Sequence, residues 1–187
     1  MKRSRYLFFL LISLFITCIH ATAQEKKDSI KKHVRLIEIS PYGDLPKPNG
    51  YVNDFENIFS AKERSILENL VSDFQKKTGI PIAVISFSTK MTKADSLDAT
   101  TMKFANAWAW GVGEKGANNG VVIGLSKAYH RMRILNGLAI QPILSEAETN
   151  QVIGTSFIPG YRSGNYFQGT YNGLKSLMAI LEKRYKN

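Results

Sequence analysis

Residues 108–125 read Trp108-Ala-Trp-Gly-Val-Gly-Glu-Lys-Gly-Ala-Asn-Asn-Gly-Val-Val-Ile-Gly-Leu125, and this stretch decides the fold because it joins a helical pattern to a strand through a loop. Four glycines lie from Gly111 to Gly120. They allow positive φ angles and close approach of the backbone to other groups. The loop that ends in Asn118-Asn119-Gly120 is therefore the first place to look for a site.

The same loop contains a glycine pattern that resembles a nucleotide-binding motif. Gly111-Val-Gly-Glu-Lys-Gly116 fits the sequence G-x-G-x-x-G. In dinucleotide-binding proteins that motif follows a strand and opens a helix, whereas here it follows a helical pattern and precedes a strand. We therefore expect no nucleotide and no organic cofactor.

Apolar periodicity on both sides of this stretch predicts seven elements. Two capping boxes, Ser60-Ala-Lys-Glu63 and Ser145-Glu-Ala-Glu148, mark helix starts. Pro159 and Gly160 should break the helix that Ser145 opens. The expected elements are a helix at 61–78, a strand at 80–87, a helix at 95–109, strands at 121–125 and 131–135, a helix from 146 to about 157 and a last helix that reaches about 183.

The order of these elements predicts a three-layer α/β/α sandwich. The helix at 95–109 connects two strands, which favours a parallel pair with a right-handed crossover. The strands at 121–125 and 131–135 form a predicted β-hairpin. We expect an α/β fold with a mixed, mostly parallel sheet of about four strands and helices on both faces. Leu36-Ile-Glu-Ile39 could add a short edge strand.

The N-terminal residues are typical of an exported protein. Residues 1–23 form a predicted signal peptide, with a basic start, an apolar run from Leu7 to Ile19 and the cleavage site Ala21-Thr-Ala23. The alternative is an uncleaved anchor, but the run falls short of the roughly 20 residues that span a bilayer. Residues 24–50 form a basic, proline-rich tether, and 51–187 form the folded domain. The mature chain should be periplasmic or secreted.

Composition limits the partners of the mature chain. Cleavage near Ala23 removes the only cysteine, and it leaves 22 basic against 15 acidic side chains, a formal charge of +7. A basic exported domain favours an anionic envelope surface or a membrane protein complex. Nucleic acid is not expected after export. No second apolar stretch of membrane-spanning length is present, so we expect no transmembrane helix in the mature chain.

Seven short segments occur in an order and with a spacing that resemble those of one known domain. They are Gly50-Tyr-Val-Asn-Asp-Phe55, Phe59-Ser60, Thr78-Gly-Ile-Pro-Ile-Ala-Val84, Trp110-Gly-Val-Gly113, Asn119-Gly-Val-Val122, Arg131-Met-Arg133 and Ile158-Pro-Gly-Tyr-Arg-Ser-Gly-Asn-Tyr166. Together they resemble the TPM domain, which a thylakoid lumen protein shares with many bacterial exported proteins. The resemblance covers about residues 50–185.

The resemblance implies a single α/β/α domain and several possible activities. Some relatives are described as acid phosphatases, some as calcium binders and others as accessory factors of membrane complexes. This sequence departs from the family pattern at Asn118, where relatives have an aspartate, and at Ser145, where they have an acidic residue. The acidic character of the implied site is therefore reduced.

Asp54 is the residue that the resemblance singles out most clearly, and it suggests a cation site. Calcium prefers six to eight oxygen ligands, and Asp54 with Asn118 and Asn119 could supply three to Ca²⁺ or another divalent cation. The alternative is turn chemistry, in which Asn53 or Asp54 caps a turn and the asparagines hold positive φ. The remaining candidates for the wall of a ligand cleft are Gly120, Trp110, Glu146 and Arg133.

Two functions follow from these residues as hypotheses. The first is a binding or accessory module at the cell envelope with a weak divalent-cation site. The second is an acid phosphatase of low activity, which would need Asp54 with a further carboxylate such as Glu56, Glu114 or Glu146. Three arginines could clamp a phosphate, although arginines on strands and loops are more often solvated. They are Arg131, Arg133 and Arg162.

Overall fold

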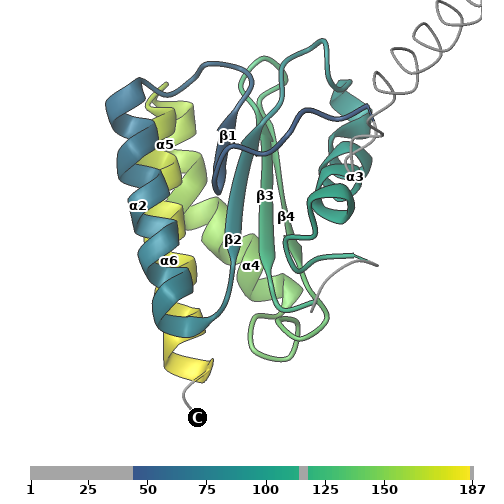
Figure 1. Cartoon of the computed structure of the whole chain (residues 1–187). Coiled ribbons are helices and arrows are strands. Elements are labelled where there is room, and N and C mark those ends of the chain that lie inside the picture. The colour runs from purple at the N-terminus through teal and green to yellow at the C-terminus, as the bar shows by residue number, and fades with distance from the viewer. Residues whose placement is uncertain (1–43, 114–117, 186–187) are drawn as a thin grey trace, which may run out of the picture. The chain divides into compact units, whose positions relative to one another are not determined.

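The computed structural model describes residues 44–113 and 118–185 (Figure 1). Its elements, in chain order, are β1 (Val52–Asp54), α2 (Ala61–Thr78), β2 (Ile82–Ser86), the short 3-10 helix η1 (Ala94–Ser96), α3 (Leu97–Trp108), β3 (Val121–Ser126), β4 (Arg131–Asn136), α4 (Glu146–Val152), the π-helical turn η2 (Ile153–Phe157), α5 (Ile158–Arg162) and α6 (Tyr166–Tyr185).

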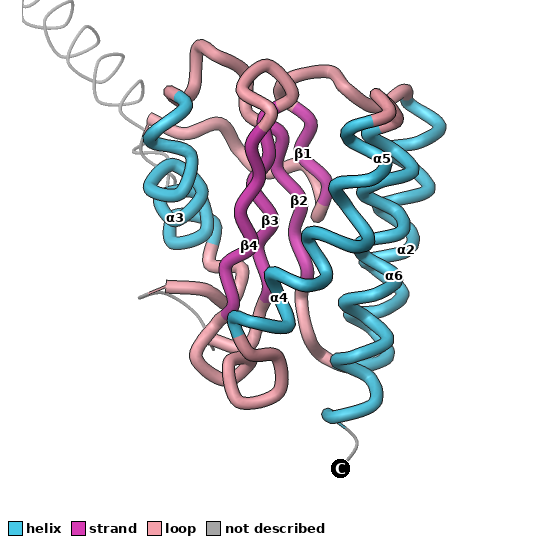
Figure 2. Tube along the Cα trace, turned by 180° about the vertical axis from the view of Figure 1, so that it is seen from behind, coloured by secondary structure: helices cyan, strands magenta, loops and turns pink. Residues whose placement is uncertain are grey.

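The four strands form one mixed sheet in the order β1-β2-β3-β4. β1 pairs parallel with β2, β2 pairs parallel with β3, and the hairpin makes β4 antiparallel to β3. α3 covers one face of the sheet, and α2, α4, α5 and α6 lie on the other (Figures 1 and 2). The three-layer sandwich and the parallel crossover through α3 are therefore confirmed.

Periodicity predicts three of the four strands and does not predict β1. Its three residues are too short to show an alternating pattern. A side chain helps to hold it in place: the carboxylate of Glu68 on α2 accepts hydrogen bonds from the backbone N–H of Tyr51 at 2.9 Å and of Val52 at 2.8 Å. The edge strand suggested at residues 36–39 lies outside the described residues.

The helix that Ser145 caps does not break at Pro159. α4, η2 and α5 follow one another without interruption from Glu146 to Arg162. Pro159 lies in the first turn of α5, where a missing N–H is tolerated. A π-helical turn precedes it. The expected break is therefore wrong because Pro159 starts a new helical segment instead of interrupting an old one.

Both predicted capping boxes are present. The Ser60 hydroxyl accepts the backbone N–H of Glu63, the Ser145 hydroxyl accepts that of Glu148, and each glutamate carboxylate accepts the backbone N–H of its serine. Glu148 is also bound by Arg184 of α6, whose Nη1 and Nη2 lie 2.9 and 2.6 Å from its two oxygens. This pair joins the start of α4 to the end of α6.

The Glu148 contacts predict a pH-dependent contribution to stability. The hydrogen bonds from Arg184, and then those from Ser145, lower the pKa of Glu148 from 4.5 to about 2. Because the folded pKa is the lower one, the contribution is complete above the unfolded pKa and is lost as pH falls toward 2. We expect Glu148→Gln to lower the free energy of unfolding at pH 7 and to match the wild type near pH 2, measured by urea denaturation. A gap that stays constant with pH would contradict this assignment.

Candidate functional site

Asp54 lies at the carboxyl end of β1, and its carboxylate holds the turn that leads into α2. Oδ1 accepts the backbone N–H of Ile58 at 3.1 Å, and Oδ2 accepts that of Phe59 at 2.9 Å. The Ser86 hydroxyl at the end of β2 donates a short hydrogen bond to Oδ1. These contacts are the turn chemistry that the sequence offered as the alternative to a cation site.

Glu56 has a similar role two residues further along the chain, at the carboxyl end of β3. Its backbone N–H donates to Ser86 Oγ at 3.0 Å. Its carboxylate accepts the backbone N–H of Lys127 at 2.6 Å and of Ala128 at 2.8 Å, and the Ser126 hydroxyl at 3.2 Å. Asp54 and Glu56 therefore use their oxygens to join the ends of three strands.

Asn118 and Asn119 lie at the opposite end of the sheet from Asp54. Asp54 is in register with Ser86, and Ser86 with Leu125. Asn119 precedes Leu125 by six residues, which places it about 20 Å away at roughly 3.3 Å per residue. The structure does not bring Asp54 together with the two asparagines. Asn118 instead takes a φ of 52°, as turn chemistry requires, and its carbonyl accepts the N–H of Ala139 at 2.9 Å.

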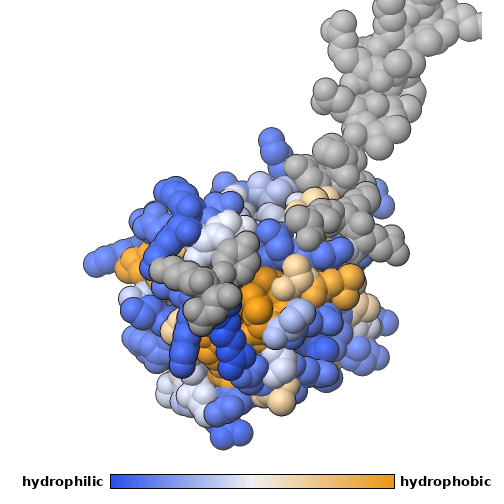
Figure 3. Space-filling model, turned by 90° about the horizontal axis from the view of Figure 1, so that it is seen from below, coloured by the Kyte–Doolittle hydropathy of each residue, from blue (hydrophilic) through white to orange (hydrophobic). Residues whose placement is uncertain are grey.

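Trp110 and Gly120, by contrast, lie close together, at the end of the sheet where Asn118 and Asn119 are found. The N–H of Gly120 donates to Gly111 O at 2.8 Å, and the N–H of Gly137 donates to Gly120 O at 2.9 Å. Trp110 packs edge-on against Trp108, with ring centroids 4.7 Å apart. Figure 3 looks onto this end and shows apolar residues exposed among hydrophilic ones.

The backbone at Gly120 predicts a steric effect of substitution. A Cβ added there would lie 2.1 Å from the carbonyl oxygen of Trp110. We expect Gly120→Ala to destabilise the fold by about 2 kcal/mol, as overpacking does in a filled site. Chemical denaturation would measure it. Gly154→Ala is the matched control, because nothing lies within 4 Å of its added Cβ. Equal stability of the two variants would contradict the prediction.

Arg133 and Glu146 also lie close together, on the outer side of β4. Arg133 Nη2 is 3.9 Å from Glu146 Oε1, and its Nε is 3.6 Å from Asp98 Oδ2 on α3. Arg133 Nε is buried and makes no hydrogen bond among the described residues. These are long contacts between largely exposed carboxylates and one guanidinium, and they leave the arginine loosely held.

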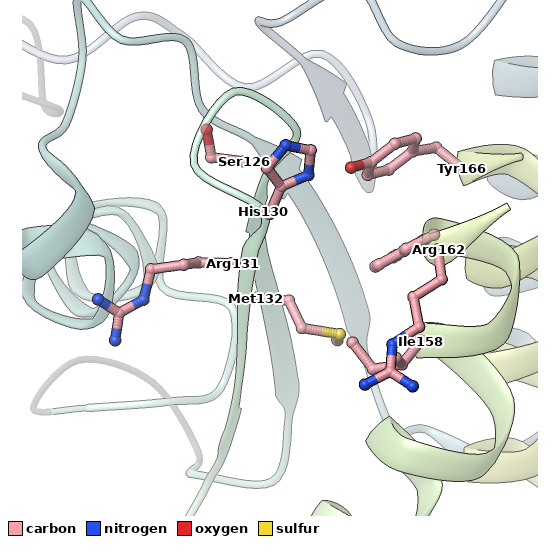
Figure 4. Close-up of a pocket in the computed structure, with 8 residues that line it drawn as sticks. Ser126, His130, Arg131, Met132, Ile158, Arg162 and Tyr166 are labelled. Atoms are coloured by element: carbon pink, nitrogen blue, oxygen red, sulfur yellow. The ribbon is translucent and has the colours of Figure 1, made fainter. Parts of the chain in front are cut away.

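A cavity of about 310 Å³ opens between the hairpin turn, β4 and the helices α5 and α6. Its lining includes Ser126, His130, Met132, Ile158, Arg162 and Tyr166 (Figure 4). The hydroxyl of Tyr166 points toward His130, and the side chain of Arg131 points away from the cavity (Figure 4). The cavity lies at the carboxyl end of β3, and in open α/β sheets ligands bind outside the carboxyl ends of the parallel strands.

The polar groups of this cavity are mostly cationic or neutral. Arg162 is exposed and forms no ion pair within the described residues. Lys127 Nζ lies 5.7 Å from the centroid of the Tyr166 ring. Burial, and then the nearby charge of Glu56, raises the pKa of Tyr166. Tyr166 therefore stays a neutral hydroxyl at physiological pH, able to donate a hydrogen bond.

A second aromatic ring packs behind Tyr166. Tyr161 stacks on it with ring centroids 4.7 Å apart and bonds to the Thr170 hydroxyl at 2.9 Å. Burial raises the pKa of Tyr161 well above its usual value. Sequence reasoning named Arg162 as one of three possible phosphate clamps, but it did not place Tyr166 and His130 in the same cavity. The one sequence signal for Tyr166 is the segment from Ile158 to Tyr166, and that segment does not include His130.

Neither a metal cluster nor a membrane helix is found in the described residues. Among residues 44–113 and 118–185, no cluster of three or more His, Cys, Asp and Glu side chains is suited to hold a metal ion. Within the same residues, no helix has both the length and the apolar character that crossing a membrane requires.

Comparison with known proteins now identifies the family. The model of the TPM domain matches residues 52–180, so the chain belongs to the TPM domain family. No curated protein matches it. The resemblance seen in the sequence is therefore confirmed.

Solved structures share the fold at low sequence identity. The N-terminal domain of a P. gingivalis protein is 23% identical with a TM-score of 0.65, covering 73% of this chain and 85% of that one. BA42 from Bizionia argentinensis is 19% identical with a TM-score of 0.54, covering 70% and 86%. The N-terminal domain of cg2496 from Corynebacterium glutamicum is 12% identical with a TM-score of 0.51, covering 73% and 84%.

Proposed function

We propose that this protein is an exported binding module of the cell envelope, and that it binds anionic groups in the cavity between β4 and α5. One observation carries the proposal. The carboxylates at the carboxyl ends of the strands, Asp54 and Glu56, are bound by the protein's own backbone, whereas the cation Arg162, which lines the cavity, has no ion-pair partner among the described residues.

The groups around Arg162 suit an anion. A guanidinium offers several N–H donors in a plane and binds carboxylate or phosphate in two-point contacts. The Tyr166 hydroxyl has no hydrogen-bond partner among the described residues and supplies a neutral donor. Lys127 adds a second positive charge at 5.7 Å from the same ring. The carboxylate of Glu56, whose charge acts on Tyr166, already accepts hydrogen bonds from two N–H groups and a hydroxyl.

Export belongs to the proposal and rests on residues 1–23 and on the basic tether at 24–50, whose first twenty residues, like the signal peptide, lie outside the described residues. We infer that the mature chain begins near Gln24 and acts in the periplasm or outside the cell, against an anionic surface or a membrane protein complex. Mass spectrometry of the protein recovered from the envelope fraction tests this directly. A chain that still carries residues 1–23 would contradict cleavage.

A weak divalent-cation site is a second feature of the proposal, and the geometry restricts it. Asp54 and the Asn118-Asn119 loop lie at opposite ends of the sheet, so a calcium ion would take its ligands from one end alone. A calcium titration followed by NMR decides between the ends. Shifts confined to residues 118–120 or to residues 54–59 would locate the ion, and no shift up to millimolar calcium would exclude the site.

An acid phosphatase is the alternative function, and one observation favours it. Arg162, Tyr166 and His130 line the same cavity, and this set can hold a phosphate and donate a proton. The mature protein, incubated with the chromogenic substrate p-nitrophenyl phosphate, separates the two functions. Binding without turnover supports the module. Turnover that disappears in Arg162→Gln would support the phosphatase, and turnover that Arg162→Gln leaves unchanged would indicate a contaminant.

A further inference from the structure

The outer edge of β4 pairs with no other strand among the described residues. Two hydrogen bonds, from Gly137 N–H to Gly120 O and from Ala139 N–H to Asn118 O, show which alternate residues of β4 have their backbone groups directed toward β3. In that arrangement Arg131, Arg133 and Leu135 bond to β3. Met132 and Ile134 then turn their N–H and C=O groups outward, and no described strand lies beyond them. Such an edge can pair with another extended chain.

The other edge of the sheet is less available. β1 has only three residues, and the outward N–H of Val52 is bound by the carboxylate of Glu68. β4 has six residues and is the outermost strand on the other side of the sheet (Figure 2). Of the two edges, β4 therefore offers the longer run of unpaired backbone.

Two cavities are lined by successive residues of β4, and we refer to the pair as the trough. The cavity of about 310 Å³ ends at Met132 and Ile158. A second cavity, of about 490 Å³, starts at Arg133 and continues past Ile134 to Asn136, with Ile153 and Ser145 on its far side. The continuous helical run α4–η2–α5 forms the far wall of both, climbing beside the sheet (Figure 2). Together the two cavities are lined by every residue of β4.

The chemistry changes along the trough. At the Met132 end stand the cation Arg162 and the Tyr166 hydroxyl. In the middle, Arg133 is held only by carboxylates at 3.6 and 3.9 Å among the described residues. On the helix side the wall is mostly polar, with Glu146, Thr149 and Asn150, and Ile153 is the apolar residue that the helical run adds to it. Two buried atoms of the wall, Arg133 Nε and Asn136 Oδ1, have no hydrogen-bond partner within the described part of the chain, which is uncommon in native structures.

From this arrangement we propose that the trough binds the C-terminal segment of a partner protein as a fifth strand, antiparallel to β4. The terminal carboxylate binds at Arg162, the last side chain and the third from the end are apolar and face Ile158 and Ile153, and the penultimate side chain is acidic and faces Arg133. The proposal rests on the anionic pocket of the proposed function, and it names the ligand class of that pocket.

A labelled peptide tests the proposal. The probe is fluorescein-Gly-Ser-Gly-Val-Ile-Glu-Ile with a free C-terminus, titrated with the mature protein and followed by fluorescence anisotropy. Two matched peptides accompany it: one ends in a carboxamide, and the other is N-methylated at the isoleucine third from the end, whose N–H pairs with Ile134. We expect saturable binding of the probe and binding at least about tenfold weaker for each matched peptide.

Two variants separate this inference from the function on which it rests. Ile153→Gln replaces this apolar residue of the helical run and should weaken the peptide about tenfold while inorganic phosphate binds as before. Arg162→Gln should weaken both ligands. The proposal is overturned if phosphate binds and the peptide does not, or if the N-methylated peptide binds as tightly as the probe. If neither ligand binds, the anionic pocket itself fails.

Discussion

Asp54→Ala should lower the free energy of unfolding by about 3 kcal/mol, because it removes a charged acceptor from two backbone N–H groups and a buried hydroxyl. The turn from Ile58 to Phe59 loses its anchor, and Ser86, which is fully buried, loses its acceptor. α2 packs on the core directly after this turn. Urea denaturation followed by circular dichroism would measure the loss as a lower midpoint.

Asp73→Ala is the matched control for Asp54→Ala. Asp73 is an exposed carboxylate on α2 whose one described ion pair, with Lys76 at 3.2 Å, is also exposed. Exposed pairs contribute between zero and about 1 kcal/mol, so this variant should unfold close to the wild type. If Asp54→Ala were as stable as Asp73→Ala and had lost a calcium response, Asp54 would be a cation ligand and not a structural cap.

Arg162→Gln should weaken the binding of inorganic phosphate about tenfold or more, because it removes a charged side chain that lines the cavity (Figure 4). The fold should not change, since Arg162 is exposed and forms no described ion pair. Isothermal titration calorimetry at low ionic strength would measure the effect, and added salt should reduce it.

Lys175→Gln is the control for charge alone. Lys175 is exposed on α6 and does not line the cavity, and its replacement removes the same unit of positive charge. The phosphate affinity of this variant should equal that of the wild type. If Arg162→Gln and Lys175→Gln lowered the affinity equally, binding would follow the net charge of the domain, and the cavity would have no specific role in it.

Local signals in the sequence predict most of the fold. The capping boxes at Ser60 and Ser145 lie where the helices start, and Gly79 ends α2 with a φ of 75°. The helix between two buried strands gives the parallel pair β2–β3, since that crossover leaves little topological choice. β1 is not predicted, because its position depends on a hydrogen bond to Glu68, which lies 16 residues away in the sequence.

The candidate site is predicted less well, because it depends on which ends of the strands meet. Asp54 is the last residue of a strand, whereas Asn118 and Asn119 precede one, and in parallel strands those positions lie at opposite ends of the sheet. Because β1 was not predicted from the sequence, it was not clear that Asp54 and the two asparagines lie at opposite ends of the sheet. Arg133 and Glu146 do meet, although 13 residues separate them, and Arg162 reaches the hairpin only through the unbroken run of α4, η2 and α5.

The central claim is that the cavity between β4 and α5 binds anions, and one titration tests it most directly. Inorganic phosphate is added to the ¹⁵N-labelled mature protein, and amide shifts are mapped on the structure. The account predicts saturable shifts at residues 126–132 and 158–166, at the upper end of the sheet in Figure 1. Shifts that cluster at residues 118–120, or no saturable shift at all, would contradict it.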